Sequence, residues 1–89
     1  MKIPRGFKKR KGVEFDKDLK RYLWHPQMGD LFFSPALNKV FEYLIWSCTV
    51  PGFCYSLDGW ARVKELNGDE SFWTNNLEVR ACVPVEKVV

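Results

Sequence analysis

The chain has 89 residues, of which 46% are hydrophobic and 28% are charged, and its formal net charge at pH 7 is +3. A chain of this length forms one domain and buries roughly 60–65% of its unfolded surface, which excludes a multidomain enzyme. No apolar run approaches the roughly 20 residues of a membrane-spanning helix, so the sequence predicts a soluble protein.

The positive charge is concentrated at the N-terminus. The first twelve residues hold six of the fourteen Lys and Arg side chains and none of the eleven carboxylates, so the remaining residues are net acidic. Pro4, Gly6 and Gly12 lie among these cations, and the pattern predicts a flexible basic arm over 1–12 ahead of one compact domain over 13–89. Such an arm favours an anionic partner. Its cations are Lys2, Arg5, Lys8, Lys9, Arg10 and Lys11.

Two helices are expected next. Apolar residues at Phe15, Leu19, Tyr22 and Leu23 have helical spacing, which predicts a helix over about 17–24. The Ser34-Pro35 pair resembles an N-cap with proline at the first helical position, and the apolar residues that follow at helical spacing predict a second helix over about 35–47. A strand over the same β-branched and aromatic residues is the competing interpretation.

The C-terminal half predicts a possible third helix and a strand. Ser56 or Asp58 is a candidate cap for a helix over about 57–67, which ends at Asn67-Gly68. From Leu77 to Val85 apolar and polar residues alternate, which predicts a strand over about 77–85, with 71–74 as its hairpin partner. Residues 31–33 are a further strand candidate. The sum is a small α+β domain with two to three helices and a short antiparallel sheet, an element order compatible with a winged-helix arrangement.

Three cysteines and one histidine raise the question of a metal site. Cys48, Cys54, Cys82 and His25 match the number of ligands that structural zinc requires, but their spacing does not match a zinc knuckle. The thiols are better explained as small buried hydrophobes, and metal binding stays open. The odd cysteine number and the absence of an apolar signal region predict an intracellular location, either cytoplasmic or in a compartment or nucleoid that contains nucleic acid.

No catalytic set is evident in the sequence. His25 has no third group to orient it toward a thiol, the carboxylates are dispersed, and no Gly-rich phosphate loop is present. We therefore expect a non-enzymatic protein that needs no cofactor.

The remaining features favour binding. The arm is expected to contact nucleic acid, RNA in particular, or a ribonucleoprotein assembly, with Arg62, Lys64, Trp60 and Trp73 as further contact residues on the body. The alternative is a protein-interaction module, such as a small inhibitor or assembly factor, which docks through its surface aromatics onto an acidic protein. Either partner places the chain in a macromolecular complex away from membranes.

Overall fold

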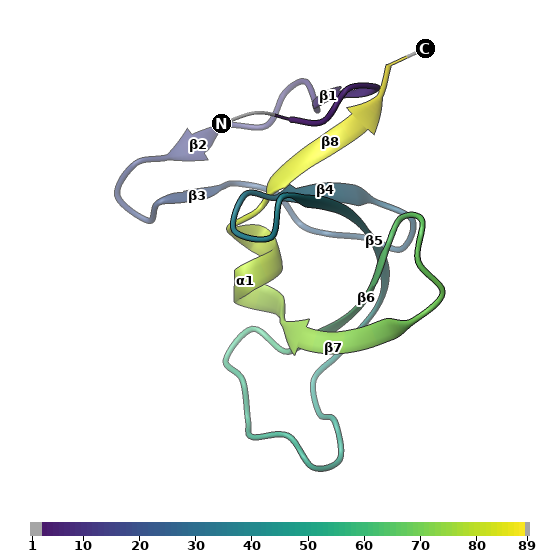
Figure 1. Cartoon of the computed structure of the whole chain (residues 1–89). Helices are drawn as coiled ribbons and strands as arrows, with labels where there is room; N and C mark the ends of the chain where they lie inside the picture. The colour runs from purple at the N-terminus through teal and green to yellow at the C-terminus, as the bar shows by residue number, and fades with distance from the viewer. Residues whose placement is uncertain (1–2, 89) are drawn as a thin grey trace.

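The computed structural model describes residues 3–88 and shows a protein built almost entirely of β-strands (Figure 1). One antiparallel sheet has six strands in the order β1-β8-β4-β5-β6-β7, and β2 and β3 form a separate hairpin. The only helix of the described residues is α1, which is too short to cross a membrane. The elements are β1 (Phe7–Lys9), β2 (Phe15–Asp16), β3 (Arg21–Tyr22), β4 (Leu31–Ser34), β5 (Lys39–Ser47), β6 (Trp60–Glu65), β7 (Ser71–Asn75), α1 (Asn76–Arg80) and β8 (Val83–Lys87).

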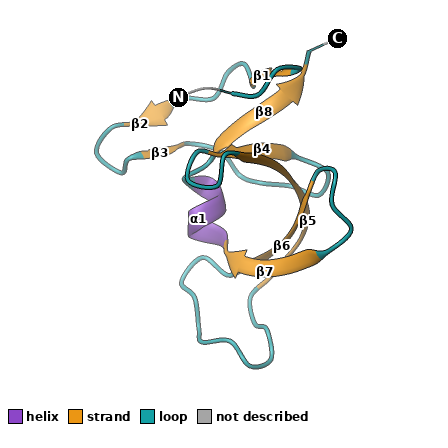
Figure 2. Cartoon of the chain, viewed as in Figure 1, coloured by secondary structure: helices purple, strands orange, loops and turns teal. Residues whose placement is uncertain are grey.

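The sheet is strongly curved. Strands β4 to β7 form a meander, and β7 curves round to the side opposite β4 (Figure 2). Helix α1 then leads from β7 back to β8, which pairs with β4 on its other edge. The core occupies both faces of the sheet around β4, because the consecutive residues Phe32 and Phe33 are both buried although their side chains point to opposite faces. Its buried members are mostly aromatic and β-branched, as a pleated surface favours. They include Phe32, Phe33, Val40, Phe41, Tyr43, Ala61, Val63, Val79, Val83 and Val85.

The expected α+β class and its winged-helix arrangement are wrong, most clearly over 35–47. The Ser34 hydroxyl accepts a hydrogen bond from the Leu37 amide at 3.3 Å, as an N-cap does, but the turn ends at Asn38, whose φ is 56°. The left-handed conformation of Asn38 reverses the chain and starts β5. A bulge after Tyr43 then places Ile45 and Trp46 on opposite faces from those that simple alternation predicts. The bulge disrupts the period of two and leaves a pattern that imitates a helix.

The helices expected over 17–24 and 57–67 are also absent. Asp16 caps a tight turn instead, because its Oδ1 accepts from the amides of Asp18 and Leu19 at 2.9 Å, and this turn joins β2 to β3. In the later segment, Ala61 and Val63 are buried while their neighbours face outward. That alternation is the period of a strand, here β6.

The predicted strand over 77–85 is wrong in its first half. The Asn75 side chain accepts from the Leu77 amide at 2.9 Å and caps α1, so the strand begins only at Val83. The strands expected at 31–33 and 71–74 are confirmed as β4 and β7. However, β7 pairs with β6 rather than with the C-terminal strand.

Part of the expected flexible arm lies on the sheet. Residues Phe7 to Lys9 form β1 and pair with β8, and the Arg10 amide donates to the Pro84 carbonyl at 2.9 Å. Phe7 packs against the core. Backbone pairing and one apolar side chain therefore hold this segment in place without a partner molecule.

Candidate nucleic-acid interface

The outward face of β6 and β7 brings together the four body residues that the sequence suggested. Trp60, Arg62 and Lys64 alternate along β6 with the buried Ala61 and Val63, so all three lie on the face away from the core. Trp73 of β7 stands directly opposite Arg62 in the antiparallel register. We call Trp60, Arg62, Lys64 and Trp73 the β6–β7 face.

Arg62 is held in one orientation on this face. Its Nε donates to the Ser71 hydroxyl at 2.8 Å, and its guanidinium carbon lies 5.5 Å from the centroid of the Trp73 ring. Cross-strand neighbours of this kind stabilise a sheet and order each other. Since neither partner neutralises the charge, Arg62 presents a fixed cation beside an aromatic ring.

Trp60 is positioned by the loop that joins β5 to β6. Its indole N–H donates to the Cys54 carbonyl at 3.0 Å, and the Phe53 ring packs edge-on against it at a centroid distance of 4.8 Å. Phe53 is exposed and extends the aromatic surface of the face. Sequence reasoning missed it, because Phe53 lies in a loop and nothing in its local pattern indicates that the loop folds back onto β6.

A chain of hydrogen bonds anchors that loop to the core. Tyr43 donates to Asn76 Oδ1 at 2.8 Å, and Asn76 Nδ2 donates to Asp58 Oδ2 at 2.9 Å. The same carboxylate oxygen accepts from Arg80 Nη1 at 3.1 Å. Burial, together with the Asp58 charge, raises the pKa of Tyr43 to about 12. The phenol therefore stays neutral and remains a donor at neutral pH.

Trp46 closes the other end of the loop. Its indole N–H donates to the Asp58 carbonyl at 2.8 Å, and its ring covers Gly59 so closely that an added Cβ would lie 2.3 Å from Nε1. Gly59 has a φ of +81°, a conformation that other residues rarely adopt. Glycine is thus required here, both for the backbone and for the tryptophan above it.

The β6–β7 face carries no paired carboxylate. Within residues 3–88, neither Arg62 nor Lys64 forms an ion pair, and Lys64 Nζ is 3.4 Å from the Gly68 carbonyl. Glu42 of β5 stands opposite Lys64 in the register, whereas Arg62 has Ile45 and Trp73 as its cross-strand neighbours, so Arg62 is the more available of the two charges.

The cations of the predicted arm lie elsewhere. Strand β1 is one edge of the sheet and β7 is the other, so the arm and the β6–β7 face do not share a strand or a neighbouring strand. Lys8 pairs with Glu86 at 3.6 Å, and Arg10 pairs with Asp30 at 3.6 Å.

Two arm cations also lie over aromatic rings. The Lys9 ammonium is 5.3 Å from the Tyr22 ring centroid, and the Arg10 guanidinium is 5.3 Å from that of Trp24. Arg5 and Lys11 are exposed, whereas Lys2 lies outside the described residues. The arm is thus a cationic edge whose charge is partly offset by the body.

The candidate metal ligands do not converge. Cys48 and Cys54 are exposed, while Cys82 is partly buried beside α1. Among the side chains of the described part of the chain, no three His, Cys, Asp or Glu residues are grouped so that they could hold a metal ion.

Comparison with known proteins does not indicate a family or a function for this chain. No protein-family model, no curated protein and no solved structure matches this chain. Its function must therefore be inferred from its own residues.

Proposed function

We propose that this chain is a non-enzymatic nucleic-acid-binding protein that contacts single-stranded RNA through the β6–β7 face. The observation that carries the proposal is the placement of Arg62 between Trp73 across the strand pair and Trp60 along β6. Among residues 3–88, neither Arg62 nor Lys64 forms an ion pair with a carboxylate. Bases stack on aromatic rings, and phosphates seek cations. A face that interleaves both can bind a strand whose bases are unpaired.

The preference for a single strand follows from the aromatic residues. In a duplex the bases are stacked on one another and their faces are inaccessible, so Trp60 and Trp73 could not contribute. Stacking is worth about 1–3 kcal/mol per base, which makes such rings a substantial part of the affinity. RNA is preferred over DNA in this proposal because of the Ser71 hydroxyl, which lies on β7 with Trp73. This hydroxyl accepts from Arg62 Nε at 2.8 Å and can still donate its own hydrogen to a 2′-hydroxyl.

The cationic edge formed by the arm has a separate role. Arg5, Lys9 and Lys11 attract a polyanion without reading its sequence, and this attraction weakens as salt is added. The β1 edge lies at the opposite edge of the sheet from β7. Its cations therefore contact a different stretch of the bound RNA, or they only raise the rate at which the RNA and the protein meet.

The test is the affinity for a short fluorescent oligouridine, measured by anisotropy between about 50 and about 200 mM salt. The variant Arg62→Gln/Lys64→Gln is expected to bind about tenfold more weakly and to reduce the slope of log affinity against log salt by about 1.4, since each phosphate contact with a single strand contributes about 0.7. Lys17→Gln, an exposed cation in the β2–β3 turn, is the matched control and should leave affinity nearly unchanged.

Tryptophan fluorescence separates stacking from simple charge attraction. Stacked bases quench Trp60 and Trp73, so Trp73→Phe should remove part of the quenching that RNA causes. Binding that is equally strong in Arg62→Gln/Lys64→Gln contradicts the proposal. Tight binding of an acidic protein through Trp60 and Trp73, with no binding of oligouridine, would replace it by the protein-interaction alternative.

A further inference from the structure

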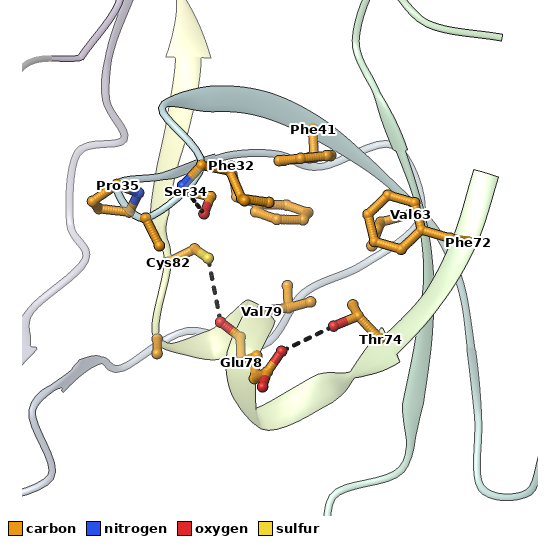
Figure 3. A pocket seen from close by; sticks show the side chains of 13 residues that line it. Phe32, Ser34, Pro35, Phe41, Val63, Phe72, Thr74, Glu78, Val79 and Cys82 are labelled. Carbon is orange, nitrogen blue, oxygen red and sulfur yellow. Dashed lines mark hydrogen bonds between the residues drawn. The ribbon is translucent and has the colours of Figure 1, made fainter. Parts of the chain in front are cut away.

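A groove of about 570 Å³ opens between β7 and the turn that joins β4 to β5 (Figure 3). Cys82 in its wall donates to the Glu78 carbonyl at 3.2 Å, and burial raises the pKa of this thiol to about 11, so it is uncharged at neutral pH. The remaining wall is largely apolar and is formed by Phe32, Phe41, Val63, Phe72 and Val79. A wall of this composition fits an apolar side chain.

Two apolar residues at the rim are exposed. Phe72 on β7 is 44% exposed although its ring packs edge-on against Phe41, and Leu37 in the β4–β5 turn is 58% exposed. Large apolar side chains around a hollow are typical of contact sites, because covering them removes apolar surface from water.

The edge of β7 beside the groove has no strand partner. Strand β7 pairs with β6 on one side, and on its other side no strand of residues 3–88 lies next to it. Ser71 to Thr74 also make no backbone hydrogen bond to a turn or loop within that range, whereas Asn75 caps α1. Phe72 and Thr74, which line the groove, belong to this strand. Unpaired amides and carbonyls are therefore available alongside the apolar hollow, the arrangement that accepts an added peptide strand.

The charge at one end of the groove indicates what kind of peptide fits. The hollow continues past Phe41 and Phe72 to a second part lined by Lys39, Glu65, Asp69 and Glu70. Lys39 and Glu65 pair with each other at 3.5 Å. Asp69 and Glu70 form no ion pair within the described range, which leaves two carboxylates facing solvent at this end.

We propose that this groove binds an extended, basic-apolar peptide segment of another protein, which adds to the free edge of β7 as a strand. One apolar side chain of the peptide enters the hollow over Phe41 and Val79, and a Lys or Arg of the peptide lies beside Asp69 and Glu70. Phe72 and Thr74 line the groove, whereas Trp73 between them lies on the opposite face of β7, so this proposal does not depend on the function proposed for the β6–β7 face.

The test begins with selection from a displayed library of random peptides against the whole chain. Enrichment of peptides that combine a large apolar residue with Lys or Arg a few positions away is the expected result. One selected peptide is then labelled and used as the probe. Leu37→Glu should weaken its binding about tenfold or more, because a charge is placed at the rim of an apolar hollow. The control is Leu19→Glu, since Leu19 is 56% exposed and lies on the β2–β3 turn.

Charge and backbone contributions are tested with the same probe. Asp69→Asn/Glu70→Gln should weaken binding several-fold at low salt and only slightly at high salt, because rim charges act through screened attraction. In a paired strand, only every second N–H of the peptide points toward β7. N-methylation of the amides at these positions should abolish binding, whereas N-methylation at the positions between them should leave binding unchanged.

Five outcomes overturn the proposal. Four of them are a library that enriches no peptide, enrichment of acidic peptides, a probe that binds Leu37→Glu as tightly as the parent chain, and N-methylation that has the same effect at both sets of positions. The fifth is self-association of the chain that competes with the probe, since the occupant is then a second copy.

Discussion

The two edges of the sheet combine the same residue types with different results. At the β1 edge, Lys8 and Arg10 each face a carboxylate, and Arg10 also lies on the Trp24 ring. On the β6–β7 face, Arg62 lies on the Trp73 ring but has a hydroxyl rather than a carboxylate as its partner. Cations that look alike along the sequence therefore differ in the folded chain, because carboxylates pair with some of them and not with others.

The largest expected effect comes from breaking the loop that supports the β6–β7 face. Gly59→Ala places a methyl group against the Trp46 ring in a left-handed backbone conformation. We expect a loss of roughly 2–3 kcal/mol of unfolding free energy, from backbone strain and from the bond between Trp46 and the Asp58 carbonyl. Urea denaturation measures it.

Gly52→Ala is the matched control for that substitution. Gly52 has a similar φ of +83°, but an added Cβ meets nothing within 4 Å. Its loss should be confined to backbone strain, roughly 1 kcal/mol. Equal losses in the two variants would show that the Trp46 contact contributes nothing to the loop.

The next effect tests the hydrogen-bond chain beneath the same loop. Tyr43→Phe leaves the buried Asn76 oxygen without its donor, which should cost roughly 1–3 kcal/mol. The pKa of Tyr43, raised to about 12 in the folded chain against 10.0 ordinarily, also predicts a pH dependence.

The folded state favours the neutral phenol, so its contribution is complete below pH 10 and is lost as the pH rises toward 12. The parent chain should lose up to roughly 1.4 kcal/mol per pH unit in that window from this group. Tyr43→Phe should lose less between pH 10 and 12, although Cys82 still contributes in the same direction because burial raises its pKa to about 11. Parallel stability profiles for the two chains would contradict this assignment.

The smallest expected effect is on the stability contributed by the two arginines that lie over tryptophan rings. Arg10→Gln and Arg62→Gln each remove a cation from an aromatic ring and from one polar partner, so each should cost roughly 0.5–1 kcal/mol of stability. Only Arg62→Gln should also weaken oligouridine binding severalfold, because Arg10 is already occupied by Asp30. The measurements are thermal unfolding and anisotropy on the same samples. A larger loss of RNA affinity in Arg10→Gln would move the interface to the β1 edge.

Local sequence patterns correctly predicted two short strands without a bulge, β4 and β7. Residues 31–33 are short, apolar and bounded by turns, and they form β4 as expected. The candidate caps at Ser56 and Asp58 predict a helix over 57–67, and this prediction is wrong because Ala61 and Val63 alternate with outward-facing residues of β6. Asp58 is instead the centre of a hydrogen-bond cluster formed with α1. An aspartate can cap a helix or join a cluster of hydrogen bonds, and only its partners in the folded chain show which of the two it does.

Composition alone gives the asymmetry of charge and the aromatic content. Three-dimensional contacts were needed to show that β5 is a bulged strand, that Phe7–Lys9 pairs with β8, and that Arg62 lies on one face of β6 with Lys64 and opposite Trp73. The physical reason is the distance along the chain over which these contacts act. A helix is stabilised by neighbours four residues away, whereas a sheet is stabilised by partners as far apart as the two ends of this chain.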